Sequence, residues 1–167
     1  MEIGLCLGSN LGDRLGHFRE AKRRILSLSD ALFVAQSPVY ETEPVDVAPE
    51  HAALSFLNAI LIIERRGDAT ALPRQLRGIE EAMGRRRGPD RNSPRPMDVD
   101  IIYAGGVRIS TPDLTVPHPR WSERRFVVQP LADVRPDLRL PGETRTVRQV
   151  LESLPSDKKV SRFAETW

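Results

Sequence analysis

Two aspartates, Asp98 and Asp100, alternate with apolar residues in the segment 97–103, and this alternation predicts a β-strand. Side chains alternate between the two faces of a strand, so both carboxylates project to the same side, about 6.5 to 7 Å apart along the chain. Two like charges beside a buried strand repel each other and are costly to desolvate, and a divalent cation removes that cost. Magnesium suits such a pair because it takes one or two carboxylates and completes its shell with water and phosphate oxygens. The alternatives are a solvated strand face or two carboxylates paired with arginines.

The loop before this strand is strongly cationic. Between Gly84 and Arg95 it carries one acid, Asp90, and five arginines: Arg85, Arg86, Arg87, Arg91 and Arg95. Guanidinium groups grip phosphate oxygens in pairs, and together with a metal ion they neutralise charge on a transferring phosphoryl group. The alternatives are a solvated basic loop or a patch for nucleic acid. Because only two residues separate the loop from the aspartates, the sequence favours a magnesium-dependent enzyme that transfers phosphate groups from ATP.

Two further segments carry polar residues suited to binding phosphate. His118 lies between two prolines that stiffen the backbone, and three arginines follow it closely: Arg120, Arg124 and Arg125. A lone histidine is more often structural or merely exposed, so these neighbouring cations are the reason to consider it. The turn 8–13, GSNLGD, resembles a phosphate-cradling loop before a helix, but the chain has no G-x-x-x-x-G-K-[ST] motif. A tight structural turn is the better interpretation of that segment.

Length and composition are those of a globular protein. The chain has 167 residues, of which 40% are hydrophobic and 29% charged, with a net charge of +2; this argues against disorder and predicts a single domain over 1–167. No apolar run approaches the roughly 18 to 20 residues of a membrane span, and the N-terminal segment lacks the features of a secretory signal. The one cysteine, Cys6, lies in an apolar run and is expected to be a buried structural thiol. We expect the protein in the cytoplasm.

The hydrophobic pattern predicts the elements that position these residues. The first six are a strand at 2–7, a helix with Phe18, Ala21, Ile25 and Leu28 on one face, strands at 32–40 and 56–64, a helix at 70–83 and a strand at 97–103. This βαββαβ order predicts an α+β, ferredoxin-like fold, with a mainly antiparallel sheet and two helices on one face. We expect the strand 56–64 to be buried on both faces and the strand 97–103 to be central. The C-terminal additions are a hairpin near Gly105, a helix over 123–131, a helix with Val147, Val150, Leu151 and Leu154 on one face, and a short strand over 160–163.

These residues fall in six segments that together resemble one known family. The segments are GSNLGDR (8–14), YETEPV (40–45), FLNA (56–59), IEEAMGRRR (79–87), RNSPRPMDVDII (91–102) and VPHPRWSERRFVVQPL (116–131). In this order they resemble the 6-hydroxymethyl-7,8-dihydropterin pyrophosphokinase (HPPK) family of folate biosynthesis, and the likeness covers nearly the whole chain. The ferredoxin-like fold of that family agrees with the βαββαβ order.

The resemblance implies a reaction and a set of site residues. The reaction is transfer of a pyrophosphoryl group from ATP to the hydroxymethyl oxygen of the pterin, by attack at the β-phosphorus, with release of AMP. Asp98 and Asp100 match the pair that binds two Mg²⁺ ions, and Arg85 and Arg95 match catalytic arginines. The implied ATP contacts are Glu80, Arg87, Arg95, Ile101, His118 and Arg124. The implied pterin contacts are Thr42, Pro44, Val45, Phe56, Asn58, Asn92 and Phe126, with Asn58 at the polar edge of the ring and Phe126 stacked on it.

Some positions depart from the family pattern. Asn92 stands where some members have a tryptophan that closes over the pterin, and Phe56 stands where some have a tyrosine. Trp121 is a candidate replacement for this aromatic lid. The arginine loop and the loop 43–50 are expected to close on the substrates and exclude water.

Two other interpretations stay open. A nucleic-acid-binding ferredoxin-like module would use the arginine loop on backbone phosphates, but aromatic residues are only 5% of the chain and paired aspartates repel RNA. An inactive relative of the family would serve as a binding scaffold, and the complete polar set, Asn58 and His118 included, argues against it. We therefore expect ATP and hydroxymethyl-dihydropterin as partners, no nucleic acid or membrane, and a monomer.

Overall fold

An antiparallel sheet of six strands lies at the centre of the computed structural model, which describes residues 1–43, 54–66, 69–86, 93–156 and 160–167. The strands of this sheet are β1 (Glu2–Ser9), β2 (Ala31–Gln36), β3 (Val39–Thr42), β4 (Phe56–Arg65), β5 (Asp98–Ala104) and β8 (Val160–Ala164). Their order is β5-β1-β4-β3-β8, and β2 pairs with the second half of β4 beyond β3. The order of the first βαββαβ elements is that of a ferredoxin-like sheet, so the predicted α+β class is confirmed.

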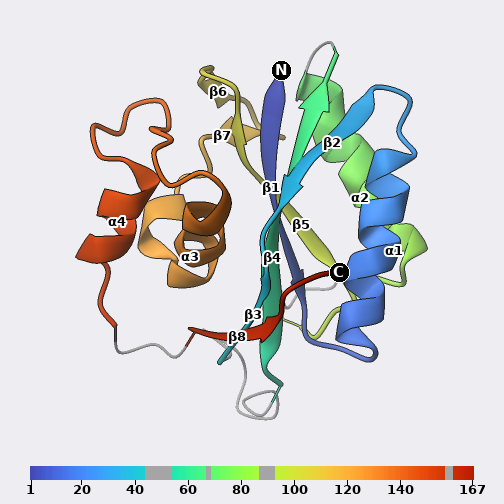
Figure 1. Ribbon diagram of the computed structural model, residues 1–167. Coiled ribbons are helices and arrows are strands. Elements are labelled where there is room, and N and C mark those ends of the chain that lie inside the picture. Colours follow the sequence, from blue (N-terminus) through green and yellow to red (C-terminus); the bar gives the residue numbers. More distant parts are fainter. Residues whose placement is uncertain (44–53, 67–68, 87–92, 157–159) are drawn as a thin grey trace.

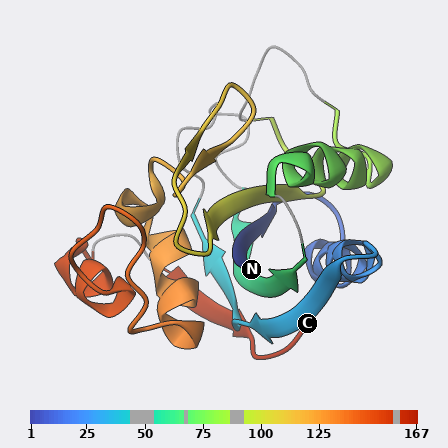
Figure 2. The same cartoon turned by 90° about the horizontal axis from the view of Figure 1, so that it is seen from above.

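Helices cover both faces of the sheet (Figures 1 and 2). The helices α1 (Arg14–Leu26) and α2 (Leu72–Ala82) lie on one face, and α3 (Arg125–Val134) and α4 (Val147–Ser153) lie beyond the other. Short 3₁₀ turns, η2 (Ala69–Ala71) and η3 (Trp121–Glu123), precede α2 and α3, and the hairpin β6 (Ile109–Ser110) and β7 (Thr115–Val116) follows β5. Of the C-terminal additions, α3 and α4 therefore form a third layer and close the sheet face that the two predicted helices leave open, whereas β8 joins the sheet beside β3. No helix in the described ranges is long and apolar enough to cross a membrane.

Local sequence signals explain where the first two helices begin. The Asp13 side chain caps α1 by accepting a hydrogen bond from the backbone N–H of Gly16, 3.0 Å away. Pro73 lies in the first turn of α2, where a missing N–H costs nothing. Both helices then bury the apolar faces that their spacing predicts, such as Phe18 and Ile25 in α1.

Two predicted strands differ from the observed ones. The predicted strand 32–40 divides into β2 and β3 at Pro38, which has no N–H to donate to a ladder. Ser37 carries the connection: its N–H donates to the carbonyl of Ile60, and its hydroxyl accepts from the N–H of Ile60. The predicted strand 97–103 is not central, because among the described strands β5 pairs with β1 alone and lies at the end of the sheet. The apolar residues of this strand led us to expect a neighbouring strand on each side. In the structure they are buried instead because other layers cover both faces of β5.

The two faces of β1 belong to two separate cores. Leu5 and Leu7 point toward α1 and α2, whereas Cys6 points toward α3 and packs with Ile60. The thiol of Cys6 is buried and free, and burial, with the nearby charges of Asp100 and Asp98, raises its pKa. The prediction of a structural thiol is therefore confirmed.

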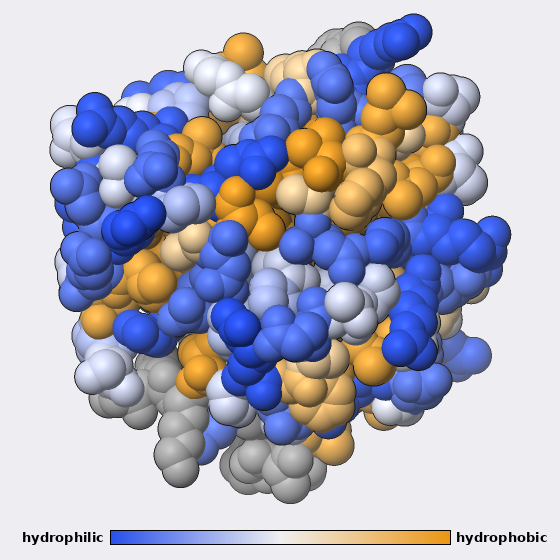
Figure 3. All heavy atoms as spheres, viewed as in Figure 1, coloured by the Kyte–Doolittle hydropathy of each residue, from blue (hydrophilic) through white to orange (hydrophobic). Residues whose placement is uncertain are grey.

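Apolar side chains gather over β2 on the face shown in Figure 3. Leu32, Phe33 and Val34 are all exposed, the first by 54%. The Lys22 ammonium group lies 4.9 Å from the centre of the Phe33 ring and covers part of it. Single exposed apolar residues are ordinary in soluble proteins, but three in succession form a small patch.

Candidate active site

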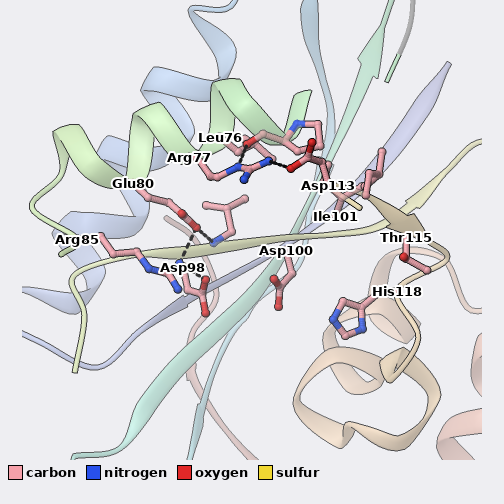
Figure 4. A pocket seen from close by; sticks show the side chains of 13 residues that line it. Leu76, Arg77, Glu80, Arg85, Asp98, Asp100, Ile101, Asp113, Thr115 and His118 are labelled. Atoms are coloured by element: carbon pink, nitrogen blue, oxygen red, sulfur yellow. Dashed lines mark hydrogen bonds and ion pairs between the residues drawn. The ribbon is translucent and has the colours of Figure 1, made fainter. Parts of the chain in front are cut away.

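Asp98 and Asp100 project from the same side of β5, as the strand alternation predicts (Figure 4). In the sheet, Asp98 lies opposite Gly8 and Asp100 lies opposite Cys6, so both face the α3 side. The Asp98 side chain is 21% exposed and that of Asp100 is 44% exposed. The two carboxylates thus lie where the layer formed by α3 gives way to solvent.

Two arginines neutralise Asp98. Arg85, just after α2, donates from Nη1 to Asp98 Oδ1, and the Nη2 of Arg95 lies 2.9 Å from Asp98 Oδ2. Burial raises the pKa of Asp98, but the charges of Arg95 and Arg85 outweigh it and keep the pKa below its usual value. Asp98 is therefore ionised at neutral pH, with a cation against each oxygen.

Asp100 has much weaker compensation. The Nη1 of Arg124 lies 3.7 Å from Asp100 Oδ2, which is too far for a hydrogen bond. Burial, followed by the negative charge of Asp98, raises the pKa of Asp100 to about 6. The pair thus carries negative charge that the surrounding side chains leave partly uncompensated, on the side open to solvent.

This pair of carboxylates fits a magnesium ion. In the described part of the chain there is no group of three or more His, Cys, Asp or Glu side chains placed to hold a metal. Magnesium needs only one or two carboxylates, because water and phosphate oxygens complete its shell. A cation near Asp100 would also stabilise its ionised form, which the protein alone disfavours.

Glu80 fixes the position of the site relative to α2. Its side chain is buried, and its Oε1 accepts from the backbone N–H of Val99 and from Arg85 Nη1, each at 2.8 Å. The first bond satisfies an N–H of the edge strand β5, and the second orients the guanidinium that contacts Asp98. The contacts seen for Glu80 are thus with the site's own framework, and the predicted contact with ATP stays a prediction.

A cavity of about 300 Å³ opens beside the two aspartates. Of the predicted site residues, its lining includes Glu80, Arg85, Asp98, Asp100, Ile101 and His118. The sequence interpretation missed other lining residues, among them Leu76, Arg77, Asp113 and Thr115. Helical spacing offers a signal for Leu76, four residues before Glu80, and closeness to His118 in the sequence offers one for Asp113 and Thr115. Arg77 and Asp113 pair at 3.0 Å and so join α2 to the loop between β6 and β7.

His118 presents one ring nitrogen to this cavity (Figure 4). Its Nδ1 accepts a hydrogen bond from the backbone N–H of Arg120 at 3.1 Å, so the proton of the neutral ring belongs on Nε2. Burial, with the positive charges of Arg124 and Arg120, lowers the pKa of His118 to about 4. At neutral pH the ring is therefore uncharged, with an N–H on Nε2 as a possible donor to a ligand.

Two of the expected pterin residues, Asn58 on β4 and Thr42 on β3, lie across β1 from Asp98. Asn58 Nδ2 donates to Thr42 Oγ1 at 2.8 Å, and both side chains are buried. Gly8 lies opposite Asp98 on one side and opposite Asn58 on the other. A methyl group at position 8 would lie 3.4 Å from Asn58 Oδ1 and 3.9 Å from Asp98 Cβ, so the glycine leaves room for about one methyl group between the two side chains. With its nitrogen engaged, Asn58 offers an oxygen acceptor next to that space.

Two arginines connect the predicted aromatic residues to the aspartates. The guanidinium carbon of Arg95 lies 5.5 Å from the centre of the Phe56 ring, and the same group pairs with Asp98. The guanidinium carbon of Arg124 lies 5.6 Å from the Phe126 ring, and its charge faces Asp100. The structure thus brings the predicted aromatic and acidic residues into one continuous site.

Four predicted site residues lie outside the described ranges: Pro44, Val45, Arg87 and Asn92. Much of the two loops that are expected to close on the substrates also lies outside the described ranges. Trp121 is described, and the idea that it replaces an aromatic lid is wrong. Its side chain is 6% exposed and packs in the core beside Val127 and Leu131, because η3 turns it inward under α3.

Comparisons with known proteins identify relatives of this chain. The profile of the family described as 7,8-dihydro-6-hydroxymethylpterin-pyrophosphokinase (HPPK) matches residues 4–136. A protein of Methylorubrum extorquens named 2-amino-4-hydroxy-6-hydroxymethyldihydropteridine pyrophosphokinase is 35% identical over 150 residues, which are 90% of this chain and 91% of that protein. The mitochondrial folate synthesis bifunctional protein of Arabidopsis thaliana is 40% identical over 137 residues, or 80% of this chain. The chain spans only 23% of that longer protein.

Solved structures show the same fold. A crystal structure of an HPPK-DHPS in complex with substrates superimposes with a TM-score of 0.68 and 13% identity, covering 91% of this chain and 43% of that one. The wild-type HPPK-DHPS of Plasmodium falciparum with pteroate gives a TM-score of 0.67 and 14% identity, covering 90% and 42%. At this identity the likeness concerns the fold alone. With the profile match and the relative that aligns along nearly its whole length, the chain belongs to the 7,8-dihydro-6-hydroxymethylpterin-pyrophosphokinase (HPPK) family.

Proposed function

We propose that the protein transfers the pyrophosphoryl group of ATP to 6-hydroxymethyl-7,8-dihydropterin, giving AMP and the pterin diphosphate, as one catalytic domain over 1–167. One observation carries this proposal: Asp98, Gly8 and Asn58 lie side by side on neighbouring strands. Two strand spacings place Asp98 and Asn58 about 9 to 10 Å apart, which suits a flat two-ring substrate with a polar edge at Asn58 and a hydroxyl near the aspartates. The name of the Methylorubrum extorquens relative supports the same reaction.

We propose that the nucleotide binds in the cavity between α2, β5 and the loop before His118. There the neutral His118 offers its Nε2 proton, and Arg85 and Arg124 offer positive charge at the cavity wall and beside Asp100. When bound at Asp98 and Asp100, Mg²⁺ supplies charge neutralisation for the phosphates and lowers the pKa of a bound hydroxyl. We propose two such ions. Arg85 and Arg95, which pair with Asp98, would bind phosphate oxygens if Asp98 were engaged by a metal ion.

The side chains of the site orient the reacting groups. The hydroxymethyl oxygen bonds to the β-phosphorus, the bond from that phosphorus to the oxygen of the α-phosphate breaks, AMP leaves with that oxygen, and the hydroxyl proton passes to solvent. In-line placement of oxygen and phosphorus supplies much of the rate in such a transfer. Phe126 and Phe56 provide aromatic faces for the ring, and each lies beside an arginine that adjoins an aspartate.

The test is an assay for AMP with ATP, Mg²⁺ and the hydroxymethyl pterin. Release of AMP instead of ADP distinguishes pyrophosphoryl transfer from ordinary phosphoryl transfer. Asp98→Asn and Asp100→Asn should each lower kcat by about a thousand-fold, because several kcal/mol of transition-state stabilisation depend on the metal. Asp137→Asn is the matched control, since this exposed acid on the α3–α4 connection lies outside the site. Full activity in either site variant would contradict the assigned metal role.

The AMP assay, combined with two binding measurements, separates the other interpretations. Wild-type protein that binds Mg²⁺ and a non-hydrolysable ATP analogue yet releases no AMP would be an inactive relative of the family. A salt-dependent gel shift with RNA at physiological ionic strength would point to a nucleic-acid module. We propose that the protein binds neither nucleic acid nor membrane and acts in the cytoplasm. We also propose that it is a monomer, and sedimentation measures this oligomeric state directly.

A further inference from the structure

In the turn after β1, Asn10 bonds to the backbone of a site residue, Arg95. Asn10 is 3% exposed, and the backbone N–H of Arg95 donates to its Oδ1 at 2.9 Å. The backbone N–H of Asn10 donates in return to the carbonyl of Arg95, 3.3 Å away. Two residues that are 85 positions apart in sequence are thereby joined by two hydrogen bonds.

Arg95 depends on this attachment for its position. Residues 93–97, just before β5, form neither helix nor strand, so no helical or sheet hydrogen bonds hold the backbone there. Yet the Arg95 side chain has to reach Asp98 on one side and the Phe56 ring on the other. A side chain can be placed only as accurately as the backbone from which it starts, and Asn10 fixes that backbone at both its N–H and its carbonyl.

One part of the Asn10 side chain lowers the stability of the folded protein. Its Nδ2 is buried and makes no hydrogen bond to any described residue, and an unpaired buried donor costs free energy. A rotation of the side-chain amide that exchanges Oδ1 and Nδ2 does not remove this cost, because Nδ2 and the N–H of Arg95, both donors, would then face each other. Buried groups that remain unsatisfied in this way are often tolerated where function requires the other half of the group.

We propose that Asn10 is a positioning residue for Arg95. The inference rests on the proposed function, since it concerns how Arg95 meets phosphate and pterin. Asn10 itself touches neither substrate. Its effect is to place the Arg95 guanidinium where the side chains of Asp98 and Phe56 converge.

The test compares Asn10→Ala with Asp13→Ala. Both variants lose a side-chain acceptor of a backbone N–H in the same turn, but Asp13 bonds to Gly16 in α1 and not to Arg95. Asn10→Ala should lower kcat by about 10- to 100-fold, the scale expected when a catalytic group is misplaced by about 1 Å. Asp13→Ala should lose stability and keep kcat. Equal kcat values for the two variants would overturn the proposal.

A double-mutant cycle isolates the route of the effect. In a background of Arg95→Ala, the change Asn10→Ala should lower kcat by less than about 2-fold further, because residues that act through one group are not additive. Effects that multiply in full would show that Asn10 acts independently of Arg95, which contradicts the proposal.

Two further measurements keep the inference testable if Asn10→Ala does not fold. Asn10→Asp retains an oxygen acceptor for the N–H of Arg95 and should keep kcat within about 3-fold of wild type. The Arg95 amide should also exchange slowly with solvent in the wild type, and fast exchange would contradict the contact. If wild-type protein gave no AMP, the proposed function would be wrong. If the enzyme were active but its kcat did not depend on Asn10, only this inference would be wrong.

Discussion

One face of the sheet has two ends of opposite character, although the same strands form both. At the end near the N-terminus, the Tyr103 ring covers Gly4, and the Tyr103 hydroxyl donates to Glu2 at 2.7 Å. Arg135 from the end of α3 donates to both oxygens of Glu2, and this bonding keeps the pKa of Glu2 below its usual value. Every charged group in this cluster has a partner, and the end is closed.

At the other end of the same face, the groups remain available for a ligand. Gly8 is followed across the sheet by Asp98 on one side and Asn58 on the other. The three described atoms nearest to a methyl group at position 8 would belong to Asn58, Asp98 and Leu57, and none of them is part of an aromatic ring. Among the described residues, no cation lies within hydrogen-bond distance of Asp100, and there is room for a methyl group beside the Asn58 oxygen at position 8. The comparison shows that, among the described residues of this face, negative charge stays partly uncompensated where the layer of α3 ends. That end is where substrates are expected to bind.

The largest expected effect concerns the closed end. A methyl group at position 4 would lie 2.1 Å from the Tyr103 ring, so Gly4→Ala forces the ring or the strand to move. Overpacking of this kind costs roughly 1 to 3 kcal/mol or more, and we expect a loss of about 3 kcal/mol in the free energy of unfolding. Urea denaturation measures it. In a background of Tyr103→Leu the same change should cost clearly less, and an unchanged cost would show that the ring is not the obstacle.

Acid should weaken the open end through His118. Burial and the charges of Arg124 and Arg120 lower the pKa of His118 from 6.5 to about 4, so the folded protein binds fewer protons than the unfolded chain between these values. This contribution to stability is therefore complete above about pH 6.5 and is lost as the pH falls toward 4. The full shift corresponds to roughly 3 kcal/mol, and because the ring is only partly buried we expect about 2 kcal/mol.

The comparison with His118→Gln isolates that contribution. The free energy of unfolding should be measured for both proteins between pH 7 and pH 4 by denaturant titration. The advantage of wild type over the variant should shrink by about 2 kcal/mol across this range. Parallel curves would show that His118 does not carry the shift, since all other titrating groups are common to both proteins.

The sequence predicted the content of the open end but not the cluster that closes the other end. Alternation placed the two aspartates on one face, and the basic segment placed Arg85 and Arg95 near them, because these relations are local. Periodicity also predicted the burial of Phe18 and Ile25 on α1.

Long-range relations escaped prediction because they depend on the order of the sheet. Apolar content made the strand of Asp98 appear central, whereas helical layers on both sides explain its burial at the end of the sheet. The pairing of Asn10 with Arg95 spans 85 residues, and no local pattern announces it. The inward turn of Trp121 likewise follows from the packing of α3, which the sequence placed two residues too early.

The smallest expected effect concerns Gly8, where fold and function should separate. The backbone at Gly8 has no positive φ, and a methyl group there would meet Asn58 Oδ1 at 3.4 Å and Asp98 Cβ at 3.9 Å, which are ordinary contacts. Gly8→Ala should therefore fold with a free energy of unfolding within about 1 kcal/mol of wild type, since alanine is entropically favoured over glycine in a strand. The methyl group nevertheless occupies the space assigned to the pterin, and we expect about 10-fold weaker pterin binding, equivalent to about 1.4 kcal/mol.

Calorimetric titration with the pterin and a non-hydrolysable ATP analogue measures this loss, and nucleotide affinity alone should stay unchanged. Gly78→Ala is the matched control, because a methyl group on that outer turn of α2 meets nothing within 4 Å among the described residues and should leave both affinities as they are. Unaltered pterin binding in Gly8→Ala would mean that the ring lies elsewhere. Together with Gly4→Ala, the series tests directly whether one sheet face uses a glycine for packing at one end and for substrate at the other.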